Sequence, residues 1–198
     1  MYHFFAHLSR MKFIDRWSLM RCTHRENVQE HSLQVAVVAH ALALIKNKYF
    51  AGSILPDRVA LLAIFHDATE VLTGDLPTPV KYFNGEIREA YKAIEGHAID
   101  QLLLLLPEDL RKEYQNLLEI ADDEKEAKTL IKAADTLCAY IKCLEERSTG
   151  NHEFSRAQKS IEEKLNVYRH MPEVDYFIRN FVPSFNLTLD EISTPLKI

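Results

Sequence analysis

Glycine and cysteine are both scarce in this chain of 198 residues. There are only five glycines, and long stretches carry apolar residues at helical spacing, which together predict an all-α fold. The three cysteines, Cys22, Cys138 and Cys143, form no C-x-x-C pair and fit reduced thiols of the cytosol. We expect Cys138 and Cys143 to be small core residues and not metal ligands.

Other absences exclude classes of function. No apolar run reaches the roughly 18 residues of a membrane span, and the N-terminus lacks the apolar core of a signal peptide, so we expect a cytoplasmic protein without a membrane partner. The net charge is −5 and no basic stripe is present, which argues against a nucleic-acid polymer as partner. The length and the 47% hydrophobic content predict a single domain over residues 1–198.

Residues 66–70 (HDATE) are the most unusual stretch. They follow residues 59–65 (VALLAIF), which contain no polar side chain, and we expect one buried helix over 56–73 that ends at Gly74. Such a helix carries His66, Asp67 and Glu70 into the interior. Burying a charge costs several kcal/mol unless it is paired or binds a metal. A buried histidine that simply bonds its neighbours is the commoner outcome for an isolated pair, so further ligands are needed.

Two further polar residues lie on apolar helix faces. His31 follows the N-cap Asn27 on an apolar stripe of a helix expected over 28–47, and Asp135 lies on an apolar face of a helix expected over 122–149. Aspartate is a poor helix former in mid-helix, which counts against an accidental placement. Two imidazoles and two carboxylates suit one divalent ion with open coordination positions, and they do not suit a closed structural zinc site. The predicted ligands are His31, His66, Asp67 and Asp135.

The order H…HD…D on three helices resembles the HD-domain phosphohydrolases. Residues 16–17 (RW), 26–32 (ENVQEHS), 66–81 (HDATEVLTGDLPTPVK), 132–135 (KAAD) and 181–185 (FVPSF) are similar to the bacterial 5′-deoxynucleotidases of the YfbR type, essentially end to end. The resemblance implies an HD-domain helical bundle that hydrolyses a deoxyribonucleoside 5′-monophosphate to the deoxynucleoside and phosphate. It also implies one divalent metal ion such as cobalt, manganese or copper, and a homodimer.

The expected reaction is attack on the 5′-phosphate by water that the ion activates. Glu70 lies one helical turn beyond His66 and would act as base or orienter of that water, while Asp75 would assist proton transfer to the leaving oxygen. Which of the two is base and which is acid stays open. Arg16 would hold two phosphate oxygens, and by resemblance Trp17 borders the sugar and excludes a 2′-hydroxyl. The expected substrate-binding set is Arg16, Trp17, His31, Asp75, Leu76, Pro77, Thr78 and Asp135.

Three alternatives remain open. Another HD phosphohydrolase reaction, on a triphosphate or a signalling nucleotide, would need more basic residues than Arg16, Arg21, Arg25 and Lys81 provide. A non-catalytic metal or nucleotide sensor would be expected to have lost a ligand or the equivalent of Glu70. A two-iron oxygenase would need further histidine ligands, for which His97 stays a candidate. The expected enzyme tolerates several bases.

Overall fold

The computed structural model describes residues 1–81 and 83–193, and it confirms the all-α prediction, since this part contains helices and no strand. One isolated antiparallel bridge joins Asp15 to Asn27. The α-helices are α1 (Phe4–Leu8), α2 (Val28–Tyr49), α3 (Pro56–Ile64), α4 (Glu70–Thr73), α5 (Thr78–Lys81), α6 (Gly85–Leu104), α7 (Glu108–Leu118), α8 (Lys125–Ser148), α9 (Ser155–Asn166), α10 (Pro172–Asn180) and α11 (Leu189–Ile192). Short 3-10 helices lie at Ser9–Phe13, Asp122–Glu124, His152–Phe154 and Val182–Asn186.

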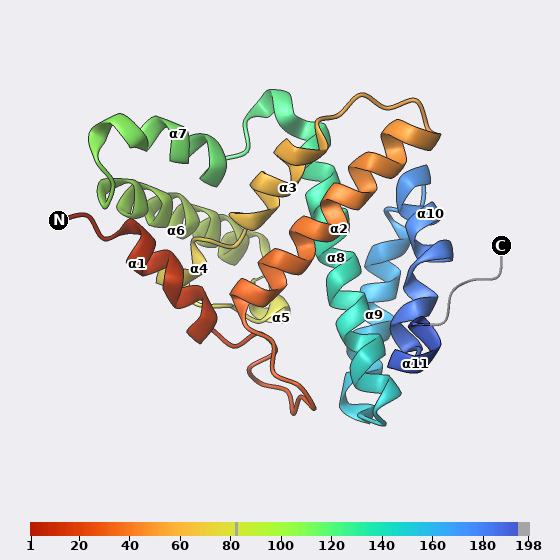
Figure 1. Ribbon diagram of the computed structural model, residues 1–198. Coiled ribbons are helices and arrows are strands. Elements are labelled where there is room, and N and C mark those ends of the chain that lie inside the picture. The colour runs from red at the N-terminus through yellow and green to blue at the C-terminus, as the bar shows by residue number, and fades with distance from the viewer. Residues whose placement is uncertain (82, 194–198) are drawn as a thin grey trace.

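The long helix α2 crosses the middle of the molecule and packs against both α3 and α8 (Figure 1). Helices α9, α10 and α11 lie on one side of it, and α1, α6 and α7 lie on the other. The main core forms between α2, α3 and α8, where Leu42, Leu62 and Leu137 are fully buried. Each such side chain contributes roughly 1.5–3 kcal/mol by leaving water. This packing fixes α2 and α8, which carry His31 and Asp135, and α3, which precedes His66 and Asp67.

A second, smaller cluster joins the N-terminal helix to α6 through Phe4, Leu102, Leu103 and Leu106. Cys138 is buried in the main core, and Cys143 is buried as well, which confirms the expectation that they are interior residues. All three cysteines are free thiols. The single domain over residues 1–198 stays a prediction, and residues 194–198 lie outside the described part.

The start of α2 is fixed by a capping box. The side chain of Asn27 accepts from the backbone N–H of Glu30 at 3.0 Å, and the Glu30 carboxylate accepts from the N–H of Asn27 at 3.2 Å. These bonds satisfy two donors that a helix N-terminus otherwise leaves unpaired. His31 follows directly, so the capping box sets its position. The predicted N-cap is therefore confirmed.

The prediction of one helix over 56–73 is wrong. Helix α3 ends at Ile64 and α4 begins at Glu70, and residues 65–69 form tight turns. Here backbone N–H groups bond three residues back, from Phe65 to Leu62 at 3.2 Å and from Ala68 to Phe65 at 3.0 Å. This is the pattern of a 3-10 helix, with 3.0 residues in a turn instead of 3.6. A stretch of five residues is too short for its apolar positions to distinguish a period of 3.0 residues from one of 3.6. The sequence therefore could not reveal the break between α3 and α4.

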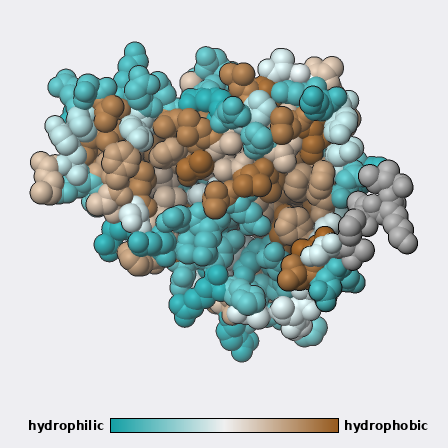
Figure 2. Space-filling model, in the orientation of Figure 1, coloured by the Kyte–Doolittle hydropathy of each residue, from teal (hydrophilic) through white to brown (hydrophobic). Residues whose placement is uncertain are grey.

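The expectation that α2 and α3 are buried on all sides is also wrong. An apolar face lies open to solvent on α2 and α3, and Figure 2 shows apolar side chains gathered over this region. We call it the α2–α3 face; its residues are Leu33 (62% exposed), Val37 (63%), Leu44 (40%), Leu61 (40%) and Ile64 (42%). The opposite sides of both helices are buried in the main core.

Two smaller boundaries differ from expectation. The two prolines within residues 75–79 predict a stiff loop there, but this loop ends at Pro77, because Thr78 begins the short helix α5, with Pro79 in its first turn. Proline is well tolerated there, since the first N–H groups of a helix have no partner within it. The long helix expected from residue 122 begins at Lys125, after a 3-10 turn.

Within residues 1–81 and 83–193, one helix, α2, is long and apolar enough to cross a membrane. Of its most apolar stretch, 56% is buried inside the protein. The core helix of a globular protein also has this length and composition, so α2 is weak evidence for a membrane span.

Candidate metal centre

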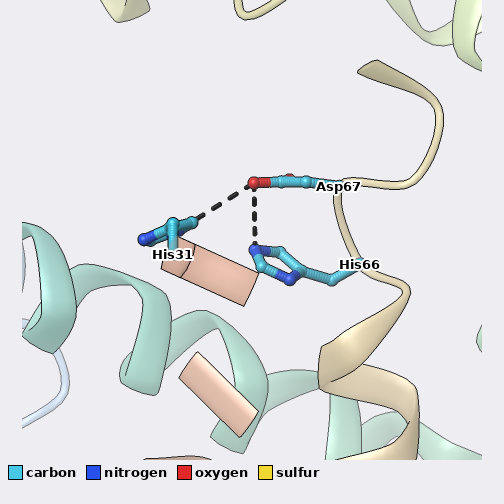
Figure 3. Close-up of side chains that lie close together, drawn as sticks. All are labelled: His31, His66 and Asp67. Atoms are coloured by element: carbon cyan, nitrogen blue, oxygen red, sulfur yellow. Dashed lines mark ion pairs between the residues drawn. The ribbon is translucent and has the colours of Figure 1, made fainter. Parts of the chain in front are cut away.

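Three elements bring the four predicted ligands together. His31, His66 and Asp67 each offer one ligand atom, and these three atoms all lie within 4.8 Å of one another. Figure 3 shows both rings facing the same Asp67 oxygen, which lies 3.9 Å from His31 Nε2 and 3.2 Å from His66 Nε2. Asp135, from α8, places its Oδ1 3.0 Å from His31 Nε2. The elements are α2, the turns after α3, and α8, in the order that the sequence predicts; that the four residues hold a metal stays a prediction.

The His66 ring is oriented by the turn that carries it. Its Nδ1 lies 2.7 Å from the carbonyl oxygen of Ala63, and because a carbonyl only accepts, Nδ1 carries the proton. In the neutral ring the lone pair is then on Nε2. This atom is buried and has no hydrogen-bond partner among the described residues. A histidine whose other nitrogen donates to a backbone carbonyl is typical of metal ligands. The donor set and its orientation therefore fit a divalent ion.

Negative charge exceeds positive charge around this cluster. Burial alone would lower the pKa of Arg16, but Asp135, Asp67, Glu26 and Asp75 outweigh burial and raise it. Burial likewise opposes ionisation of Asp67, yet the charges of the two histidines and Arg16 hold its pKa below the ordinary value. Buried carboxylates in excess of buried cations are costly unless a cation joins them. The site thus favours a bound metal ion.

Glu70 lies beside the cluster of histidines and aspartates, and its carboxylate binds a proton unusually strongly. Burial, followed by the charges of Asp67 and Asp75, raises the pKa of Glu70 to about 9. Its Oε2 is buried and has no hydrogen-bond partner in the described part of the chain. Burial also raises the pKa of Asp75. A bound cation opposes these effects and favours the ionised carboxylate, which makes Glu70 a suitable acceptor for the proton of a nearby water.

For His66, burial opposes the charged form, but the negative charge of Asp67 and its contact with the ring raise the pKa to about 9. For Asp135, burial is opposed by the hydrogen bond and charge of His31, which hold its pKa below the ordinary value. His66 and Asp67 therefore stabilise one another as charged groups. A divalent ion must displace the proton on His66 Nε2, so its binding releases a proton.

Arg16 and Trp17 reach this cluster from the segment before α2. Arg16 places one guanidinium nitrogen 3.5 Å from Asp67 Oδ2. Its Nε donates to Glu26 Oε2 at 3.1 Å, and Trp17 Nε1 donates to the same oxygen, also at 3.1 Å. The indole packs on Phe154 with ring centroids 5.3 Å apart. The structure thus places Arg16 beside the predicted ligand Asp67, and Glu26 joins Trp17 to Arg16.

The loop after α4 carries the predicted residues Asp75, Leu76 and Pro77. Asp75 is close enough for its charge to act on Glu70 and Arg16. Leu76 and Pro77 are half-buried, and the side chain of Thr78 lies outside what the structure describes. The substrate-binding roles of these residues stay predictions. His97 is exposed on α6 and is not part of the histidine and aspartate cluster.

Sequence reasoning assigned no role to Glu26. It lies within the motif segment 26–32, but it precedes the N-cap of α2, where no periodicity indicates which way a side chain points. Its contacts with Arg16 and Trp17 span 10 and 9 residues and depend on how the intervening loop folds.

A family described as "5′-deoxynucleotidase YfbR-like" matches residues 3–185. A 5′-deoxynucleotidase from Vibrio atlanticus is 57% identical over 191 residues, which cover 96% of this chain and 98% of that protein. The chain belongs to the YfbR-like 5′-deoxynucleotidase family. The predicted family is therefore confirmed, and as a member the chain is a hydrolase.

Solved structures agree with this family in fold. An HD-domain phosphohydrolase from Listeria innocua aligns with a TM-score of 0.81 at 23% identity, over 92% of this chain and 88% of that one. A cyanophage S-2L HD phosphohydrolase, solved with dA and one catalytic Zn²⁺ ion, aligns with a TM-score of 0.63 at 19% identity, over 90% and 96% of the two chains. The predicted HD-domain helical bundle is therefore confirmed for this YfbR-like chain.

Proposed function

We propose that this YfbR-like protein hydrolyses deoxyribonucleoside 5′-monophosphates to the deoxynucleoside and phosphate, with tolerance of several bases and selectivity for 2′-deoxyribose. The observation that carries the proposal is the position of Arg16. Its guanidinium lies 3.5 Å from Asp67, the carboxylate that both histidines face. A guanidinium binds two phosphate oxygens at once, so one phosphate would be held directly beside the metal ligands.

The cofactor of this proposal is one divalent metal ion held by His31, His66, Asp67 and Asp135. By resemblance to the family, cobalt, manganese and copper are the candidates, and mixed nitrogen and oxygen ligands are compatible with each of them. When bound, such an ion supplies Lewis-acid activation of water and of the phosphoryl oxygens.

The protein's own residues would supply binding and proton transfer. Arg16 orients the phosphate, and Glu70, whose carboxylate a bound cation would keep ionised, takes the proton of the attacking water. Asp75, whose pKa burial raises, would give a proton to the leaving 5′-oxygen. Trp17 would border C2′ of the sugar, where a fixed indole leaves no space for a hydroxyl.

The basic residues near the site favour a substrate with one phosphate. Arg21 and Arg25, which a larger nucleotide would need, have side chains 93% and 85% exposed, and they pair with Glu153 and Asp15. Arg16, by contrast, is 13% exposed and contacts a predicted ligand. A sensor without catalysis is disfavoured because all four ligands and Glu70 are present.

We further propose that the protein is a cytoplasmic homodimer. Three free thiols fit a reducing compartment. The α2–α3 face carries large exposed apolar side chains on two adjacent helices, and a contiguous apolar surface of this kind marks an interaction site. A second copy of the chain would cover it.

The test is phosphate release by metal-stripped protein to which cobalt, manganese, copper, magnesium or zinc is returned singly. Paired deoxyribo- and ribonucleoside 5′-monophosphates of several bases are the substrates. Metal-dependent release from the deoxy member alone supports the proposal in full. Equal release from both members supports a phosphatase and contradicts the role of Trp17. Absence of release with every metal contradicts the proposed function.

A further inference from the structure

Glu26 is the shared partner of the two residues that reach the substrate site. One carboxylate oxygen, Oε2, accepts from Arg16 Nε and from Trp17 Nε1, both at 3.1 Å. The Glu26 side chain is 12% exposed and that of Arg16 is 13% exposed, so water competes little for these bonds. Hydrogen bonds to an ionised carboxylate are roughly twice as strong as neutral ones. Arg16 and Trp17 are thus held against one another through a single atom.

The backbone brings Glu26 to this position. Arg16 N–H donates to the Glu26 carbonyl at 2.9 Å, and Val28 N–H donates to the Ile14 carbonyl at 3.0 Å, which closes the segment into a loop with adjoining ends. Within it, Trp17 has a φ of +57°, in the left-handed region that costs a bulky residue energy. This conformation needs outside support, and the bond from Trp17 Nε1 to Glu26 provides it.

The second oxygen of Glu26 faces the metal centre. Oε1 lies 4.0 Å from Nδ1 of His31, a fully buried atom that has no hydrogen-bond partner in the part of the chain described. A metal bound at His31 Nε2 requires the ring proton to be on Nδ1, and metal-binding histidines commonly direct that N–H toward a carboxylate. Glu26 is therefore placed between a predicted metal ligand and the two predicted substrate-binding residues.

We propose that Glu26 is a positioning residue that holds the phosphate-binding guanidinium of Arg16 and the sugar-facing indole of Trp17 as one rigid unit. In this role Glu26 determines how strictly the site discriminates 2′-deoxyribose from ribose. The inference rests on the proposed function, since it names the residue that keeps the expected sugar contact in place. Glu26 itself touches neither the phosphate nor the sugar.

Trp17 is the only tryptophan of the chain, so its fluorescence reports the position of this ring without any substrate. The zinc-loaded wild type is compared with Glu26→Ala, Glu26→Gln and the control Glu153→Ala. Zinc is used because it is redox-inert. Glu153 bonds Arg21 on the exposed side of the same loop, so the control removes a carboxylate contact from the loop without touching Arg16 or Trp17.

Glu26→Ala is expected to move the emission of Trp17 to longer wavelength and to increase quenching by acrylamide, because the indole gains freedom and water. The ratio of kcat/KM for the deoxy and ribo substrates should fall by about tenfold, mainly through a higher KM for the deoxy member. Glu26→Gln keeps an acceptor for both N–H groups but loses the charge, so a fall of about threefold is expected. Glu153→Ala should match the wild type in emission and ratio.

Unchanged emission and quenching in Glu26→Ala overturn the proposal, and so does an equal loss of activity on both substrates. If circular dichroism shows that Glu26→Ala does not fold, Glu26→Gln decides, and a ratio equal to that of the wild type overturns the inference. A wild type that releases phosphate from neither substrate with zinc or with any other returned metal refutes the proposed function, whereas the fluorescence of the variants still tests whether Glu26 holds Trp17.

Discussion

At the scale of single residues, the candidate site depends on a break in helical structure. His66 and Asp67 are adjacent in sequence, and an α-helix would separate their side chains by about 100°. In the turns after α3, both present an atom toward the same point, with Nε2 and Oδ2 3.2 Å apart. The carbonyl of Ala63, at the end of α3, accepts from His66 Nδ1 at 2.7 Å. The end of the helix thus orients the ring.

Glu70 is expected to affect catalysis without holding the metal. Replacement by alanine should lower turnover by roughly 10²–10⁴-fold, since it removes the acceptor for the proton of water. Metal content after desalting, measured by elemental analysis, should equal that of the wild type, because Glu70 is not among the ligands. Glu70→Gln, which keeps the shape but not the basicity, should behave alike. Loss of metal in both variants would contradict the assigned role.

Asp135 is expected to be a metal ligand. Asp135→Ala should weaken metal binding by about 100-fold or more, a larger effect than the 10–100-fold loss typical of outer partners. Titration calorimetry on stripped protein measures this directly. The matched control is Thr136→Ala at the next position of α8, where the exposed hydroxyl bonds the carbonyl of Lys132. Full metal content and full activity in Asp135→Ala would refute the ligand role.

At the scale of elements, the loop that carries Arg16 and Trp17 is anchored to α8. Glu146 accepts from the backbone N–H groups of Thr23 and His24, at 2.8 and 3.2 Å, and from Lys142 Nζ at 2.7 Å. Lys142 in turn donates to the carbonyl of His24 at 2.6 Å. Although both charges are buried, each is paired and hydrogen-bonded, so the network is satisfied. Helix α8 therefore supplies one predicted ligand and also holds the loop that carries Arg16 and Trp17.

This anchor predicts a pH dependence of stability. Burial opposes ionisation of Glu146, but Lys142 and the backbone N–H groups outweigh it and lower the pKa from 4.5 to about 2. A depressed folded-state pKa stabilises the protein above pH 4.5, and this contribution is lost as the pH falls from 4.5 toward 2. Glu146→Gln should lose on the order of 2 kcal/mol in the free energy of unfolding at pH 7.

Urea titrations of Glu146→Gln and the wild type at several pH values check this prediction. The difference between them should shrink as the pH falls from 5 to 3. Glu163→Gln, on the exposed surface of α9, is the control and should stay within about 0.5 kcal/mol of the wild type throughout. A difference for Glu146→Gln that is independent of pH would show that the charge of Glu146 does not stabilise the fold.

The helices and their buried stripes could be predicted from the sequence, because apolar spacing, Asn27 and Gly74 are local signals. His31, His66, Asp67 and Asp135 were brought together by recognising the order of the motif. The turns at 65–69 were not predictable, because a change from the α-helical to the 3-10 period over five residues is too short to show in the spacing of apolar side chains. Glu26 and Glu146 were missed because their partners lie in a loop whose path only the folded chain defines.

At the scale of the whole molecule, helices α2 and α3 each contribute one side to the main core and the other side to the exposed surface. The inner sides of α2 and α3 form the main core, and His31 lies on the inner side of α2. Their outer sides form the α2–α3 face. A partner on this face would contact α2, which carries His31, and α3, which precedes His66. The proposed self-association and the predicted metal site would therefore be connected through these two helices.

Val37→Lys is expected to convert the proposed homodimer to a monomer. Val37 is 63% exposed near the middle of α2, so a lysine there is tolerated in the single chain but places a charge inside an apolar interface. Size-exclusion chromatography with light scattering measures the mass, which is 22.9 kDa for one chain. The control is Leu189→Lys on α11, which is 74% exposed and lies to the right of α2 in Figure 1, and which should leave the mass unchanged. A dimeric Val37→Lys would assign the interface to another face, and a monomeric wild type would refute the homodimer.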